Sequence, residues 1–177
     1  MVVLLGILSA FSFGIGDFLA RFSSKEVGFK NSLFWMLIVG AIFYIILFSF
    51  FGNGLNPNSI GLSNSFLSGI LIMFGLLCLY RGLQMGPVSI VAPITAINPL
   101  FVFLIRFALG SEPTFHQWVA TIIIIFGAIL VSFSADSHRQ SLGLNKKQIK
   151  ESIVVSFMAS VMLALGLIFS QEASNTL

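Results

Sequence analysis

The residue best suited to chemistry in this chain is Asp17, the only carboxylate in an apolar stretch over residues 2–22. Placing a charged carboxylate near the middle of a bilayer costs on the order of 3 kcal/mol, so such acids commonly serve ion coupling, substrate contact or structural pairing. A low dielectric disfavours the ionised carboxylate, which makes Asp17 a candidate for binding and releasing a proton. The alternative is a structural ion pair with Arg21, four residues along the same helix face.

A second pair of candidates, Tyr80 and Arg81, closes the third apolar stretch. Arg81 can meet an anionic group of a solute, or it can pair with Asp17. The alternative is an interfacial arginine whose guanidinium reaches the lipid headgroups.

The fourth apolar stretch contains Pro93 and Pro99, together with Thr95 and Asn98. Each proline removes a helical hydrogen bond and frees a carbonyl oxygen, so this segment should kink or break. Broken membrane helices often line substrate sites, and Asn98 is the polar group that we expect to face a cavity. The alternative is a kink that serves packing alone.

Composition places these residues in an integral membrane protein. Of the 177 residues, 57% are hydrophobic and 8% are charged, and the mean hydropathy is +1.03. The basic balance (net charge +3, pI about 9.4) therefore indicates topology signals in loops, not a nucleic-acid partner. Cys78 is the only cysteine, which excludes a disulfide within the chain. We predict no metal, no cofactor and no catalytic residue, because the apolar stretches offer neither Ser with His nor paired acids.

The elements that position these candidate residues are six apolar segments, each long enough to cross a bilayer as a helix. They predict an all-α polytopic transmembrane helix bundle. The segments cover residues 2–22, 32–51, 65–84, 88–109, 116–134 and 152–170.

Lys and Arg residues predict the orientation of this bundle. Eight of the nine basic residues fall in odd-numbered connections, and Arg106 alone lies beside an even-numbered one. The positive-inside rule then places the odd connections in the cytoplasm and the N-terminus outside.

Small residues predict a close helix contact and an internal repeat. The first span carries Gly6, Ala10, Gly14 and Gly16, which give a smooth face for a neighbouring helix. With an offset of 150 they align with Ser156, Ser160, Ala164 and Gly166. Small residues are common in membrane helices, so chance similarity is the alternative.

If the repeat is real, the domains are a five-span unit at 1–134, a basic connection at 135–151 and the first helix of a truncated second unit at 152–177. Five spans is an odd number, so a second unit would be inverted in the membrane. This organisation implies either a fragment or a half-size protein that pairs.

Several motifs, in order and spacing, carry a family resemblance. They are Gly14–Ala20 (GIGDFLA), Tyr80–Ile94 (YRGLQMGPVSIVAPI), Asn98-Pro99, Leu109–Glu112 (LGSE) and Gly127-Ala128. Together they resemble the EamA-type drug/metabolite transporter superfamily over nearly the whole chain, with Ser111 inserted before Glu112 as a departure. Full members have ten spans in two repeats and often both termini in the cytoplasm, opposite to the charge count for the N-terminus.

The resemblance implies a carrier for small metabolites or drugs, working by exchange or proton coupling. We therefore expect a multi-pass protein of the plasma membrane that moves a small solute by alternating access. Its partners would be the lipid bilayer, the solute, and a second copy or second half-transporter chain. The alternative is a membrane scaffold without transport that packs through its small-residue helix faces.

Overall fold

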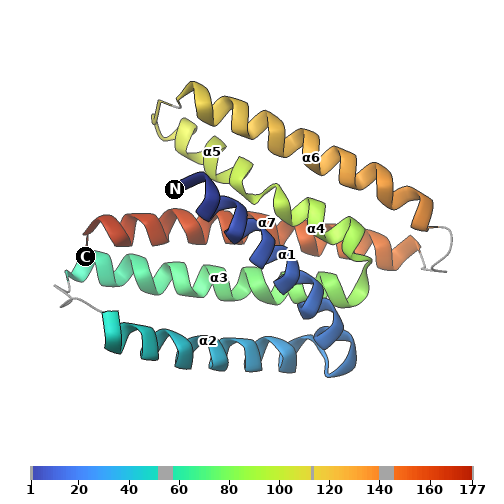
Figure 1. Cartoon of the computed structure of the whole chain (residues 1–177), viewed down its shortest axis with the longest axis horizontal. Helices are drawn as coiled ribbons and strands as arrows, with labels where there is room; N and C mark the ends of the chain where they lie inside the picture. Colours follow the sequence, from blue (N-terminus) through green and yellow to red (C-terminus); the bar gives the residue numbers. More distant parts are fainter. Residues whose placement is uncertain (1, 52–57, 113, 140–145, 177) are drawn as a thin grey trace.

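The computed structural model describes residues 2–51, 58–112, 114–139 and 146–176, and within these ranges the chain forms seven α-helices and no strand (Figure 1). This architecture confirms the predicted all-α bundle. The helices are α1 (Val2–Glu26), α2 (Phe29–Phe51), α3 (Ser59–Met85), α4 (Val88–Ala96), α5 (Asn98–Ala108), α6 (Phe115–Arg139) and α7 (Lys146–Thr176).

Five stretches are long and apolar enough to cross a membrane, and they match five of the six predicted spans. The described apolar part of α6, Phe115–Ala128, is shorter. Most helices run past the predicted limits, because a backbone helix continues through polar residues at which an apolar run stops. Residues 135–139 continue α6 and 146–151 open α7, while 140–145 lie outside the described residues. The five stretches are Leu4–Glu26, Phe29–Phe50, Ser59–Met85, Val88–Ala108 and Lys147–Asn175.

Short turns join the first helices and fix their directions. Gly28 links α1 to α2 with φ at +86°, a left-handed conformation that favours glycine. After α3, the Gly86 N–H donates to Gly82 O at 2.8 Å, and Pro87 then caps the start of α4. Proline suits a helix start because its missing N–H has no partner there. The helices α1 to α4 therefore alternate in direction.

The fourth predicted span is divided in two at Ile97, between α4 and α5. Pro93 lies inside α4, and Pro99 lies in the first turn of α5. Ile97 keeps φ −76° and ψ −8°, close to helical values, and its N–H bonds to Ile94 O at 3.4 Å. The helix is therefore interrupted at one residue, and the chain continues in the same direction.

The core of the bundle is the antiparallel contact between α3 and α7, which small residues bring close together (Figure 1). A Cβ added to Gly166 on α7 would lie 2.6 Å from Ile72 Cγ1 on α3. A Cβ added to Gly82 on α3 would lie 2.9 Å from Ser156 Oγ on α7. Glycine at these positions lets the two backbones approach to a distance that a larger residue would prevent.

Serine hydroxyls add polar contacts between the same two helices. Ser68 Oγ on α3 donates to Gly166 O at 2.8 Å, and Ser152 Oγ on α7 donates to Gly82 O at 3.5 Å. Hydrogen bonds of this kind between membrane helices contribute about 0.6 kcal/mol each on average. The α3–α7 pair is thus held by backbone proximity together with a polar contact at each end.

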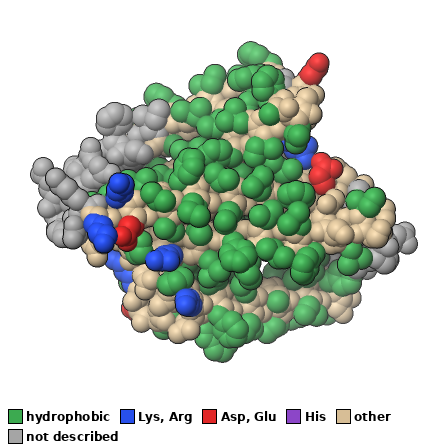
Figure 2. All heavy atoms as spheres, turned by 180° about the vertical axis from the view of Figure 1, so that it is seen from behind, with side chains coloured by type: hydrophobic (Ala, Val, Ile, Leu, Met, Phe, Trp, Pro, Cys, Tyr) green, Lys and Arg blue, Asp and Glu red, His purple; other side chains and the backbone are tan. Residues whose placement is uncertain are grey.

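The helix α2 lies beside α3, α1 crosses α3 obliquely, and α6 lies outermost beyond α4 and α5 (Figure 1). Figure 2 shows large hydrophobic side chains spread over one face of the molecule, as expected for a surface in contact with lipid. The predicted small-residue face of α1 is also uncovered: nothing lies within 4 Å of a Cβ built on Gly6, Gly14 or Gly16, and Ala10 is exposed. The close neighbour predicted for this face stays a prediction.

Basic residues gather at one end of the bundle (Figure 2). This end holds the last turn of α1, the start of α2, the end of α3 and the start of α7, as the packing of Gly86 against Ser152 shows. Arg106 lies near the end of α5, which is the opposite end of the bundle. The charge asymmetry counted along the sequence is therefore an asymmetry between the two ends of the molecule.

Candidate functional site

The residues predicted to form one site occupy two separate places in the structure. Asp17 and Tyr80 belong to the first, where the second half of α1 crosses α3. Asp17 is half-buried, Tyr80 is 6% exposed, and the two side chains are close enough to interact electrostatically. Ala20, one turn after Asp17, shares a buried cluster with Tyr80 and Leu33. Among the described side chains of α1, those packed into the bundle lie between Asp17 and Ser24.

The two ion pairs considered for Asp17 do not form among the described residues. Arg21 is partly buried on the same helix, but no contact within ion-pair distance joins it to Asp17. Arg81 is exposed at the end of α3, and no contact within ion-pair distance joins it to Asp17. Asp17 therefore has no basic partner in the part of the chain that the structure describes.

Thr95, the third candidate, is buried and turned toward its own helix. Its side chain is 7% exposed, and Oγ1 lies 3.0 Å from Val91 O and 3.1 Å from Ala92 O. A threonine that bonds back to the preceding turn often bends a helix. Its position supports the interruption between α4 and α5 more directly than it supports contact with a solute.

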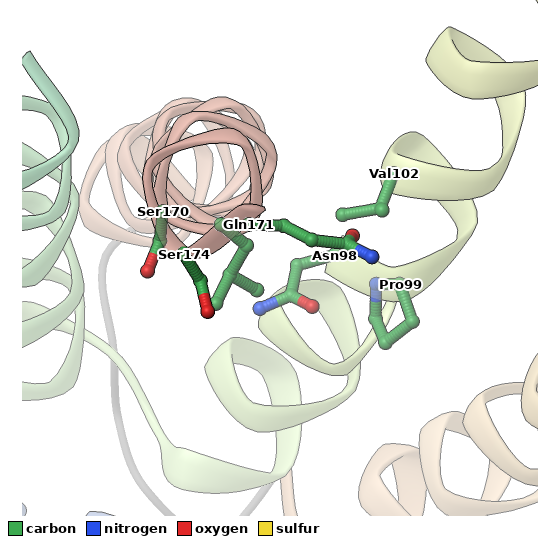
Figure 3. Close-up of a pocket in the computed structure, with 7 residues that line it drawn as sticks. Asn98, Pro99, Val102, Ser170, Gln171 and Ser174 are labelled. Carbon is green, nitrogen blue, oxygen red and sulfur yellow. The ribbon is translucent and has the colours of Figure 1, made fainter. Parts of the chain in front are cut away.

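Asn98 lies in the second place, a groove between α5 and the last turns of α7 (Figure 3). The groove has a volume of about 490 Å³. Figure 3 shows the Gln171 side chain reaching from α7 toward the α5 side, above Asn98. The lining residues are Asn98, Pro99 and Val102 from α5 with Leu167, Ser170, Gln171 and Ser174 from α7.

The groove runs from the middle of one apolar span toward the end of another. Asn98 is near the midpoint of the Val88–Ala108 span, whereas Ser174 is one residue from the end of the Lys147–Asn175 span. The two helices run in the same direction, because Phe101 packs on Phe157 and Arg106 contacts Glu172. The groove therefore approaches the end of the bundle opposite the basic one.

An ion pair stands beside the surface end of this groove. Arg106 is two turns after Asn98 on the same face of α5, and its Nη2 lies 3.4 Å from Glu172 Oε1 on α7. Arg106 Nε is buried and has no hydrogen-bond partner among the described residues. The pair joins α5 to α7 and brings its two charges together outside the lining of the groove.

Sequence reasoning missed the α7 half of the groove. Ser170 is the last residue of the predicted sixth span, and Gln171 and Ser174 were beyond it. The available signal was their spacing, because residues 170, 171 and 174 share one face of a helix. Following the helical periodicity past the last apolar residue would have identified them.

The described residues of the groove offer groups that can hold a small molecule. No group of three or more His, Cys, Asp or Glu residues that could hold a metal ion occurs among the described residues. The groove instead combines a broken helix, four uncharged polar side chains and an apolar wall. Polar groups of this kind orient a ligand, while the apolar wall supplies contact area.

Comparison with known proteins identifies the family. The sequence profile of the EamA-like transporter family matches residues 1–133. An uncharacterized protein of Methanocaldococcus jannaschii is 32% identical over 136 residues, a match that covers 75% of this chain and 96% of the relative. No solved structure matches the chain. The motifs, the polytopic helical fold and these matches agree: the chain belongs to the EamA-like transporter family, a family of membrane transporters.

Proposed function

We propose that the protein forms one wall of a secondary transporter that moves a small solute across the plasma membrane by alternating access. The observation that carries this proposal is the groove at the interrupted fourth span. Non-helical backbone inside a membrane is tolerated where it lines a cavity or is buried in protein. Here the interruption at Ile97 stands directly before Asn98, which lines the groove.

The packing suggests which parts move and which stay fixed. The α3–α7 pair is close-packed and hydrogen-bonded, so it acts as the rigid part. The α5 segment is joined to α7 across the groove by the pair of Arg106 with Glu172, whose exposed geometry contributes about 0–1 kcal/mol. A contact that weak can open and close during a transport cycle. Movement of α5 about Ile97 would widen or narrow the groove.

A single five-span unit supplies only half of a closed pathway, so the proposed transporter contains a second unit. The second unit is a further part of the same polypeptide, a second copy of this chain or another half-transporter chain. The Methanocaldococcus jannaschii relative is matched over 96% of its length by little more than one predicted repeat. A relative of that size supports the idea that single-repeat chains pair to complete the pathway.

We assign the coupling role to Asp17. The proposal is supported by a half-buried carboxylate on the packed part of α1, beside Tyr80 and without a basic partner among the described residues. Such a group can alternate between its protonated and ionised forms as its surroundings change during the cycle. Transport would then be driven by a proton gradient or by exchange.

The uncovered face of α1 favours a second candidate function, that of a scaffold without transport. In that case Gly6, Gly14 and Gly16 would receive a helix of another membrane protein. The Gly14→Leu variant separates the two functions because it places a bulky side chain in the middle of this face. Loss of assembly without any change in solute movement would favour the scaffold.

Reconstitution in proteoliposomes tests the transporter. Purified protein is assayed for uptake of a panel of radiolabelled metabolites, with and without an imposed pH gradient. We expect saturable uptake of at least one compound, and we expect the Asn98→Leu variant to reduce it. Empty liposomes are the control. If no compound is taken up faster than by empty liposomes under either gradient direction, the transporter proposal fails and the scaffold remains.

A further inference from the structure

The groove between α5 and α7 is polar but carries no charge. Its four hydrogen-bonding side chains are the carboxamides of Asn98 and Gln171 and the hydroxyls of Ser170 and Ser174. None of the four makes a hydrogen bond to any residue that the structure describes. Each of them can both donate and accept. The groove therefore offers an unused set of donors and acceptors to a bound molecule.

The neighbouring charges do not supply a counterion for this groove. Arg106, one turn beyond Val102, is paired with Glu172 at 3.4 Å. Asp17 is at the other candidate place, where α1 crosses α3, and it is not part of the groove lining. At the depth of Asn98, near the middle of its span, a charged molecule without an opposite charge would lose hydration without compensation. We therefore expect the groove to favour uncharged molecules over anions and cations.

The arrangement of the two carboxamides further restricts the class of ligand that fits the groove. Asn98 comes from α5 and Gln171 from α7, so a ligand between the helices meets a carboxamide from each side (Figure 3). A carboxamide presents an acceptor and a donor side by side, and its best partner is another edge with that pair in the opposite order. Val102 and Leu167 add an apolar surface against which a ring can pack.

We propose that the solute is uncharged and presents an amide-like edge, a donor next to an acceptor, on a compact apolar or aromatic body. Nucleobases and aromatic carboxamides have this chemistry. The inference rests on the proposed function, because it names the class of solute for the same groove. Its distinctive content is selectivity for the neutral member of any pair of compounds that differ only in charge.

The test uses probes that share one ring and differ in charge. Equilibrium binding of radiolabelled nicotinamide to the purified, detergent-solubilised chain is compared with binding of nicotinate, its carboxylate analogue. The cation 1-methylnicotinamide is the third probe, and uracil with orotate forms a second matched pair. We expect saturable binding of at least one neutral probe and at least tenfold weaker binding of its charged counterparts.

Variants locate the binding to the groove. The Asn98→Leu and Gln171→Leu variants should each weaken binding of the neutral probe about tenfold, as expected when a ligand loses one or two hydrogen bonds. The matched controls are Asn64→Leu on α3 and Gln148→Leu at the start of α7, which remove the same groups outside the groove. Both controls should bind the neutral probe as the unaltered chain does.

Three outcomes would overturn the inference: no saturable binding of any neutral probe, equal or tighter binding of the charged analogues, or unaltered binding in both groove variants. None of these outcomes contradicts the proposed transport function. Transport of a charged compound in proteoliposomes, for example, would support the transporter proposal and contradict only the proposed class of solute. Conversely, selective binding without transport would support the groove chemistry while the transporter proposal failed.

Discussion

Gly166 shows how a single residue sets the distance between two membrane helices. It lies on the buried face of α7, and a Cβ there would be 2.6 Å from Ile72 Cγ1 and 3.2 Å from the Ile72 backbone N. A side chain can rotate away, but the backbone atom moves only if α3 moves. The free energy of the α3–α7 contact therefore depends on the absence of one methyl group.

The Gly166→Ala variant should lower the unfolding temperature of the detergent-solubilised protein, because overpacking of this kind costs typically 1–3 kcal/mol. Gly69→Ala on α3 is the matched control, since its Cβ meets nothing within 4 Å. We expect the control to unfold at or above the temperature of the unaltered chain. Equal unfolding temperatures for Gly166→Ala and the unaltered chain would contradict this prediction. They would show that α3 and α7 can move slightly apart at no cost in stability.

Asp17 is the residue on which proton coupling depends in our proposal. The Asp17→Asn variant keeps the size and shape of the side chain, replaces one acceptor oxygen with an NH2 donor, and removes the titration. We expect stimulation of uptake by a pH gradient to disappear, while solute exchange without a gradient is retained. The measurement is uptake into proteoliposomes with and without the gradient. Glu26→Gln, an exposed acid at the end of the same helix, should keep the stimulation.

The elements themselves were largely predictable from the sequence. Apolar runs long enough for a bilayer identify the spans, because unpaired backbone groups are excluded from hydrocarbon and a helix satisfies them all. The two prolines identify the fourth span as the irregular one. The helix ends were less predictable, since α7 runs on to Thr176, past Ser170 where the predicted span stopped.

At the level of the helices, Pro99 is the residue that we expect to keep the groove open. An alanine there restores an N–H that can bond to Thr95 O, which extends the helix through Ile97. In a Cys78→Ser background, the Asn98→Cys side chain should react with N-ethylmaleimide several-fold more slowly when Pro99→Ala is added. A cysteine at the exposed position 65 of α3 serves as the labelling control. An unchanged rate at position 98 would show that the interruption does not depend on Pro99.

At the scale of the whole molecule, the candidate site was harder to predict than the fold. Sequence spacing places residues on a face of their own helix, but it does not tell which two helices share a contact. Asp17 and Tyr80 do lie together, whereas Asn98 faces α7 residues that no motif had marked. The pairing of α3 with α7 decides this arrangement, and it depends on glycines and serines 70 to 98 residues apart in the chain.

We predict the orientation of the whole molecule from its charge asymmetry, and the prediction is opposite to the one that the family resemblance implies for the N-terminus. The ends of α1 and α3 and the starts of α2 and α7 carry described basic residues at one end of the bundle, so we expect this end to face the cytoplasm. The groove would then open away from the cytoplasm.

Two exposed positions at opposite ends of the bundle test this orientation in intact cells. In a Cys78→Ser background, a membrane-impermeant maleimide should label Glu112→Cys, between α5 and α6, without permeabilisation. Lys25→Cys, in the last turn of α1, should be labelled only after permeabilisation. The reverse pattern would place the N-terminus inside. The charge count would then be overruled by interactions made during insertion, and the groove would open toward the cytoplasm.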